Sequence, residues 1–118
     1  MAEMSSRNPL AMDVRQIGGA TVVTVNGSAG MSEAERMRAA LEGLAAERTP
    51  VIVLDLSRMD FICSTGLGAI IAGHLKCRHH AGQIRLVNPQ PAVKKLLETT
   101  RLTKLFPIYR TVEQAVQS

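Results

Sequence analysis

The feature that most constrains the fold of this chain is the apolar run Val51-Ile52-Val53-Leu54. Four consecutive branched apolar residues predict a strand that is buried on both faces, which is the usual state of a central strand in a parallel sheet. We expect this strand to cover residues 51–56 and a polar loop to cover residues 57–62. Ser64 then opens a long segment with helical apolar spacing, and we expect it to be the N-cap of that helix.

The segment before this strand predicts a hairpin. Residues 10–17 alternate apolar and polar side chains, which is typical of a half-buried strand. Gly18-Gly19 then predicts a tight turn, and the β-branched residues 21–25 predict the antiparallel partner strand. We expect residues 26–30 to end this strand as a flexible loop.

One helix is predicted before the apolar strand in the sequence, and another is predicted after it. Ser32 and Glu35 have the spacing of a capping box, so we expect a helix over residues 33–47. The second helix, from Thr65 to about His79, should end at Gly82 in a left-handed cap.

The rest of the chain continues the alternation of strands and helices. Residues 84–87 predict a strand, Pro91 marks the start of a third helix, and Thr111 is a candidate cap for a last one. Residues 107–110 are a candidate edge strand. The order ββαβαβαβα predicts an α/β fold with a mixed, mostly parallel sheet covered by helices.

Length and composition indicate one domain. At 118 residues, 46% of them apolar, the chain can bury a core without disulfides or metals. We expect residues 1–8 to form a flexible tail and residues 9–118 to form the domain. The start of the chain lacks the apolar core of a signal peptide, and no apolar run approaches the roughly 20 residues of a membrane span. We therefore expect a cytoplasmic protein that does not bind membranes.

The formal charge of +4 is unevenly distributed. Residues 1–60 carry six basic and eight acidic side chains, whereas residues 61–118 carry eight basic and two acidic ones. A nucleic-acid-binding domain would be expected to add stacking aromatic residues, but the aromatic residues here are only Phe61, Phe106 and Tyr109. This composition argues against nucleic acid and leaves an acidic protein partner as the alternative for the basic half.

None of the residues that could carry out chemistry predicts an enzyme. Ser64 does not lie in the G-x-S-x-G pattern of serine hydrolases, and the histidines lie more than two helical turns after it. We expect the cluster His74, Cys77, His79 and His80 to be a solvated helix end rather than a metal site. Gly66-Leu67-Gly68 lacks the lysine of a phosphate-binding loop, and no convergent polar pocket for a small molecule is evident.

One stretch carries a family resemblance. The nonapeptide Asp60-Phe61-Ile62-Cys63-Ser64-Thr65-Gly66-Leu67-Gly68, with Asp55-Leu56-Ser57 before it, resembles the signature of the STAS-domain family. More closely, it resembles the stand-alone anti-sigma-factor antagonists (anti-anti-sigma factors) of bacteria. The order of elements agrees over nearly the whole chain, and Asn88-Pro89 through Leu97 is similar to the family's later helix.

The resemblance implies a partner-switching protein rather than an enzyme. The unphosphorylated protein would bind an anti-sigma factor with serine-kinase activity and so release a sigma factor. The kinase would phosphorylate Ser64, and a metal-dependent serine phosphatase would reverse this. No cofactor or metal site is implied. The residues implied to form the docking surface are Asp60, Cys63, Ser64, Thr65, Gly66, Leu67 and Gly68.

Two positions depart from the family pattern. Many phosphorylated members carry Asp where this chain has Cys63, and Gly-Glu-Leu-Asp where it has Gly27-Ser28-Ala29-Gly30. Both differences remove a carboxylate expected near Ser64. They motivate an alternative function, a non-phosphorylated STAS adaptor that docks on a transporter ATPase or a sensory signalling complex. Cys63 itself is either a small packed residue or, as the second reading, a redox-sensitive thiol.

Overall fold

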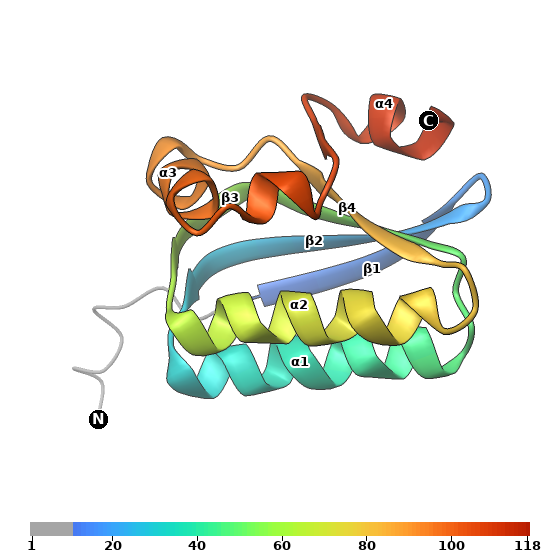
Figure 1. The fold of residues 1–118 in the computed structure, drawn as a ribbon, viewed down its shortest axis with the longest axis horizontal. Coiled ribbons are helices and arrows are strands. Elements are labelled where there is room, and N and C mark those ends of the chain that lie inside the picture. Colours follow the sequence, from blue (N-terminus) through green and yellow to red (C-terminus); the bar gives the residue numbers. More distant parts are fainter. Residues whose placement is uncertain (1–10) are drawn as a thin grey trace.

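The computed structural model describes residues 11–118 and contains one five-stranded sheet in the order β1-β2-β3-β4-β5 (Figure 1). β1 is antiparallel to β2, and the other neighbouring strands are parallel. The predicted α/β fold with a mostly parallel sheet is therefore confirmed, whereas the predicted tail, residues 1–8, lies outside the described residues. The elements in order are β1 (Ala11–Ile17), β2 (Ala20–Ala29), α1 (Met31–Ala46), β3 (Val51–Ile62), α2 (Ser64–Arg78), β4 (Gln83–Val87), α3 (Pro91–Thr99), the 3-10 turn η2 (Leu102–Lys104), β5 (Ile108–Tyr109) and α4 (Val112–Gln117).

β3 is the middle strand and is buried on both faces, as its apolar run predicts. Ile52 and Leu54 belong to the larger core cluster, which α1 and α2 cover from one side of the sheet (Figure 1). Val53 points to the opposite face, where it belongs to a smaller cluster with Ala115 of α4. All three strand residues are fully buried. β3 therefore contributes side chains to both core clusters, one on each face of the sheet.

Two predicted loops are wrong, because residues 26–29 and 57–62 are strand. These segments pair with each other in parallel, from Asn26 opposite Arg58 to Ala29 opposite Ile62. The register shifts twice along this pairing, between Thr24 and Asn26 and between Gly27 and Ser28. Such bulges let polar and glycine-rich segments remain in a sheet that their composition does not favour.

β1 is an edge strand that is more exposed than its alternation predicts. The turn at Gly18-Gly19 is confirmed, with Gly18 at a φ of +59°. Met12 is partly buried, but Val14 keeps 49% of its surface exposed. The pattern identifies the face correctly, although at an edge strand the helices do not cover that face fully.

The helix ends differ from the predictions in two places. Gly30 is the N-cap of α1, so Ser32 and Glu35 lie inside the helix and form no capping box. Ala81, rather than Gly82, takes the left-handed conformation after α2, with a φ of +64°. Gly82 serves close packing instead, because a Cβ atom there would lie 2.9 Å from the carbonyl oxygen of Thr49. The predicted starts of the last two helices, at Pro91 and after Thr111, are confirmed.

Candidate functional site

The candidate site lies where β2 and β3 end. These two strands are parallel neighbours, and each leads directly into a helix, so α1 and α2 begin at the same edge of the sheet (Figure 1). The backbone N–H of Cys63 donates to the carbonyl of Ala29 at 3.0 Å, which continues the strand pairing up to the start of α2. Two helix N-termini, with their positive dipole ends, therefore lie next to each other.

Ser64 is the first residue of α2 and not its N-cap, so the predicted capping role is wrong. Cys63 is the N-cap, with an extended backbone and no capping bond from its side chain. The first helical hydrogen bond runs from the N–H of Leu67 to the carbonyl of Cys63 at 3.0 Å. The three preceding amides, those of residues 64–66, have no partner within the helix. The exposed Ser64 hydroxyl thus stands beside unpaired N–H donors.

Two side-chain hydrogen bonds tie the segments around Ser64 together. The Ser28 hydroxyl donates to the carboxylate of Asp60 at 2.6 Å and so joins β2 to β3. The Thr65 hydroxyl donates to Sδ of Met31 at 3.4 Å and so joins α2 to α1. Each bond links residues more than thirty positions apart in sequence. The surface around Ser64 is therefore assembled from four elements.

The seven residues predicted to form a docking surface differ in their exposure. Asp60, Ser64 and Gly68 are exposed, and Cys63 and Thr65 are partly buried. The remaining two, Gly66 and Leu67, are buried. A Cβ atom at Gly66 would lie only 2.6 Å from Cγ1 of Ile62, so glycine allows α2 to start this close to β3. The buried pair thus shapes the helix start and offers no side chain to solvent.

The structure adds two residues that the sequence analysis did not single out. Phe61 is 52% exposed at the end of β3, and Met31 is 69% exposed at the first position of α1. Phe61 directly follows Asp60 in β3, and Met31 is the residue that accepts the hydrogen bond from Thr65. Large apolar side chains that are exposed beside polar ones are typical of binding surfaces. A sequence signal existed for Phe61, since it is one of only two phenylalanines and follows Asp60 in a polar segment.

The other end of α2 is only partly the solvated end that was predicted, since His79 is exposed and His80 is partly buried. His74 and Cys77 are both buried. Nδ1 of His74 accepts a hydrogen bond from the N–H of Ile84 at 3.3 Å, and its ring meets that of Phe106 edge-on at 4.9 Å. Burial, together with the nearby charge of Arg78, lowers the pKa of His74, and burial raises the pKa of the Cys77 thiol. These residues therefore stabilise the fold.

Residues 11–118 contain no group of three His, Cys, Asp or Glu side chains that could hold a metal ion. Over the same residues, no helix is both long and apolar enough to cross a bilayer.

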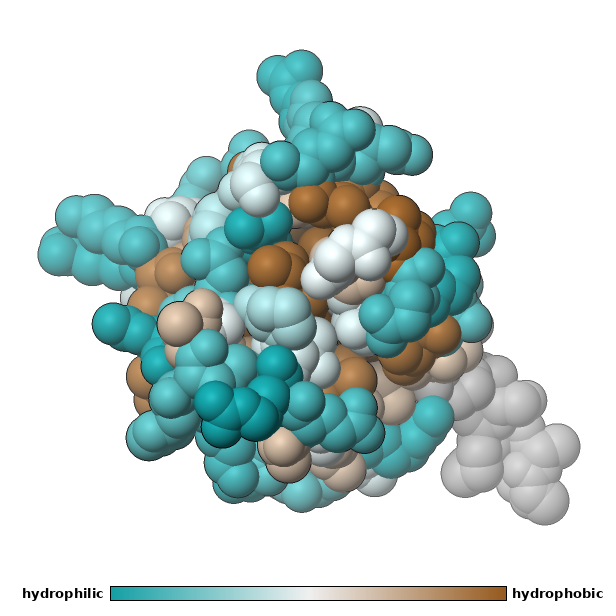
Figure 2. Space-filling model, turned by 90° about the vertical axis from the view of Figure 1, so that its right-hand side faces the viewer, coloured by the Kyte–Doolittle hydropathy of each residue, from teal (hydrophilic) through white to brown (hydrophobic). Residues whose placement is uncertain are grey.

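The helix ends and loops at the end of the molecule opposite Ser64 present mainly hydrophilic side chains around small apolar areas (Figure 2).

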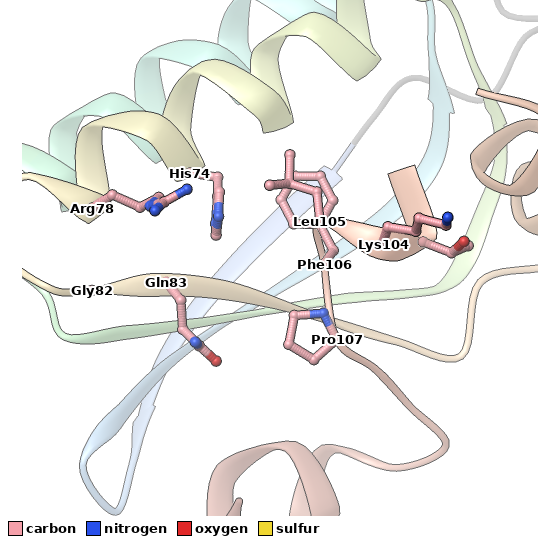
Figure 3. Close-up of a pocket in the computed structure, with 9 residues that line it drawn as sticks. His74, Arg78, Gly82, Gln83, Lys104, Leu105, Phe106 and Pro107 are labelled. Atoms are coloured by element: carbon pink, nitrogen blue, oxygen red, sulfur yellow. The ribbon is translucent and has the colours of Figure 1, made fainter. Parts of the chain in front are cut away.

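A cavity of about 500 Å³ lies near this opposite end, between α2, the start of β4 and the segment 103–107 (Figure 3). His74 and Arg78 of α2 point towards it, whereas Lys104 points away from them. Nε of Arg85 donates a hydrogen bond to Oε1 of Gln83 at 2.7 Å. The polar groups therefore do not converge on one point, and the cavity lacks the arrangement of a small-molecule site.

Comparison with known proteins gives a consistent result. The model of the STAS domain family matches residues 11–115. The protein BtrV of Bordetella bronchiseptica is 28% identical over 106 residues, which are 90% of each chain. The anti-sigma F factor antagonist of Paenibacillus polymyxa is 26% identical over 85% of this chain and 86% of its own. The crystal structure of an anti-sigma factor antagonist from Mycobacterium paratuberculosis is 30% identical, covers 92% of both chains and superposes with a TM-score of 0.83.

Proposed function

This chain belongs to the STAS domain family, and we propose that it is an anti-sigma factor antagonist that is switched at Ser64. In the unphosphorylated state it binds an anti-sigma factor that is also a serine kinase, and the sigma factor is released. Phosphorylation of Ser64 dissociates the complex, and a serine phosphatase restores the first state. The anti-sigma factor antagonists among its relatives support the partner, and the exposed hydroxyl at the first residue of α2 is the single observation that carries the switch.

The position of Ser64 suits a residue that is modified without unfolding the protein. A phosphate would add about −1.5 to −2 charges at pH 7. At the start of α2 it would meet the unpaired amides and the positive end of the helix dipole, which stabilise an anion. The first turn of α2 contains no acidic residue that would already fill this role. The fold is therefore expected to survive the modification.

The same modification would change the docking surface strongly. Phe61 and Met31 offer exposed apolar side chains, so a bound partner would exclude water around Ser64. Burying an uncompensated phosphate in such an interface costs several kcal/mol, and every 1.4 kcal/mol is about tenfold in affinity. Asp60 would add repulsion from the same surface. One added group can thus reverse binding without a change of fold.

Ser64 acts in this scheme as the substrate of another enzyme. Its Oγ would form a bond to the γ-phosphorus of ATP, the bond to ADP would break, and the hydroxyl proton would pass to a base of the kinase. No histidine of α2 lies close to the acceptor, since His74 is almost three helical turns further along. The kinase must therefore provide the base, the metal ion and the nucleotide.

The missing carboxylates keep one second candidate open. Cys63 and Gly30, the N-caps of the two helices that meet at the site, provide no carboxylate. This favours the alternative of a non-phosphorylated STAS adaptor for a transporter ATPase or a sensory complex. Affinity capture with the full chain, in extracts with ATP removed, separates the two. Recovery of a kinase-like anti-sigma factor supports the antagonist, and recovery of a transport ATPase without one supports the adaptor.

Phosphorylation is tested directly with the captured kinase, Mg²⁺ and ATP. Mass spectrometry should find one phosphate on Ser64 in the wild-type chain and none in Ser64→Ala. The matched control is Ser32→Ala, because Ser32 is an exposed serine in the first turn of the neighbouring α1 and should leave the reaction unchanged. A phosphate at another residue, or none with a kinase that binds the protein, would contradict the proposal.

A further inference from the structure

We propose that the outer edge of β1 is a self-association surface, through which two copies of this chain pair antiparallel about Val14. β1 is the terminal strand of the sheet, and among the described residues no strand pairs with its outer edge. The proposal does not depend on Ser64 or on the partner-switching function, since β1 contributes none of the residues of that site.

The geometry of the hairpin determines which backbone groups are free. Gly18 has a φ of +59° while Gly19 does not have a positive φ, as expected for a two-residue type II′ turn. In such a hairpin the flanking pair, Ile17 and Ala20, exchanges hydrogen bonds, and every second residue of the strand does the same. The N–H and C=O groups of residues 12, 14 and 16 therefore point away from β2, and within residues 11–118 no strand pairs with them.

The side chains select one register for this pairing. If two copies pair antiparallel about Val14, Asp13 of each copy faces Arg15 of the other. These would be non-hydrogen-bonded pairs, in which the side chains approach most closely. Centring the pairing on Asp13 or on Arg15 instead would place like charges opposite each other. The sequence Asp13-Val14-Arg15 is thus complementary to itself in one register only among these three.

The exposure of these side chains is consistent with the same register. Asp13 and Arg15 form an ion pair within the strand, with 3.3 Å between Nε and Oδ2, yet both remain largely exposed. Val14 is 49% exposed on the face that α1 and α2 cover elsewhere. In the proposed dimer the two Val14 side chains would lie beside each other and shield one another from water.

The expected association is weak. A single pair of seven-residue strands buries less surface than the roughly 1,200–2,000 Å² of a stable interface. We therefore expect a dissociation constant of roughly 0.1 mM, so that the dimer forms mainly at high local concentration. Sedimentation velocity on the full chain, from roughly 10 µM to roughly 1 mM, should show a rising weight-average sedimentation coefficient.

Charge reversal tests the register. In Arg15→Asp, carboxylates would face carboxylates across the dimer, and in Asp13→Arg, guanidinium groups would face each other. Each variant alone should associate at least roughly tenfold more weakly than the wild type. A 1:1 mixture of the two should recover the association, because every cross-strand pair is then opposite in charge. The double variant with both changes in one chain should also recover it.

Three outcomes would overturn the proposal. The first is a wild-type chain that stays monomeric at the highest concentration, which would leave the edge for a different protein. The second is a mixture of the two charge variants that fails to associate while the wild type does. The third is an equal loss in Arg78→Asp, a control with the same charge change on another element. Circular dichroism on every variant would establish that the fold is intact.

Discussion

The two ends of α2 each carry a polar side chain that could react, and they are built in opposite ways. Ser64 at the start is exposed, and nothing among the described residues hydrogen-bonds to its side chain. His74, near the other end, keeps 5% of its surface exposed, accepts a hydrogen bond from Ile84 and packs on Phe106. The difference separates a residue available to another protein from a residue that the fold itself requires.

The largest expected effect comes from removing the buried partner. His74→Ala should lower the free energy of unfolding by roughly 2–4 kcal/mol, because it leaves a cavity beside Phe106 and the N–H of Ile84 without an acceptor. Urea unfolding followed by circular dichroism measures this change. His79→Ala is the matched control, since His79 is exposed at the end of the same helix and should change stability by less than roughly 0.5 kcal/mol. Equal effects of the two variants would erase the proposed contrast.

The exposed end should respond in binding and not in stability. Ser64→Asp should weaken the complex with the anti-sigma factor by at least roughly 100-fold, or about 2.7 kcal/mol, because a carboxylate would be buried in the interface. Its circular dichroism spectrum should stay nearly unchanged, since a negative charge is favourable at a helix start. Titration calorimetry with the purified partner gives the affinity. Ser64→Ala should bind like the wild type, and wild-type affinity in Ser64→Asp would contradict the switch.

Two glycines sharpen the comparison within the first turns of α2. Gly66→Ala should destabilise the protein by roughly 1–3 kcal/mol, because the added Cβ would lie 2.6 Å from Ile62. Gly68→Ala meets nothing within 4 Å and should stabilise it by roughly 0.5–1 kcal/mol through helix propensity. Chemical denaturation of both variants under the same conditions measures the difference. If Gly66→Ala were as stable as Gly68→Ala, close packing of α2 on Ile62 would be refuted.

The smallest expected effect is a pH dependence at the buried end. Burial and the charge of Arg78 lower the pKa of His74 in the folded state, so folding favours the neutral ring. This contribution is fully present above the ordinary pKa of about 6.5 and is lost as the pH falls from there towards the folded-state pKa. Unfolding free energies between about pH 5 and pH 8 should decline on acidification. The decline should be smaller in His74→Gln, which lacks the titrating ring, and an identical slope would exclude His74 as its source.

The sequence predicted the layers of this fold better than the ends of its elements. Burial on both faces of a sheet could be predicted for residues 51–54 from their composition alone, because none of the four side chains is polar. Residues 57–62 could not be assigned in this way, because their strand state depends on pairing with the equally polar end of β2. Pro91 and Thr111 were predicted correctly because both act within one helical turn: Pro91 restricts its own φ at the helix start, and the Thr111 side chain accepts a hydrogen bond from the N–H of Gln114.

The candidate site shows the same limit. The position of Ser64 at the start of a helix was predictable from the apolar spacing that follows it, but the burial of Gly66 depends on Ile62, which reaches back from the end of β3. His74 is equally instructive. The charged residues that follow it in sequence, Lys76 and Arg78, indicate solvent, while its neighbours in space, Ile84 and Phe106, come from β4 and the connection before β5.

The hydrogen bonds from Ser28 to Asp60 and from Thr65 to Met31 bear on what a partner can recognise. Because they join four elements around Ser64, the surface exists only when the chain is folded. A peptide of residues 57–71 would contain Ser64 but not Met31 or Ser28, and it should be a poor mimic of the whole. If Ser64 is switched as proposed, a newly made or damaged copy that has not folded would neither capture the anti-sigma factor nor be phosphorylated by it. The amount of sigma factor released would then depend only on the number of folded antagonist molecules.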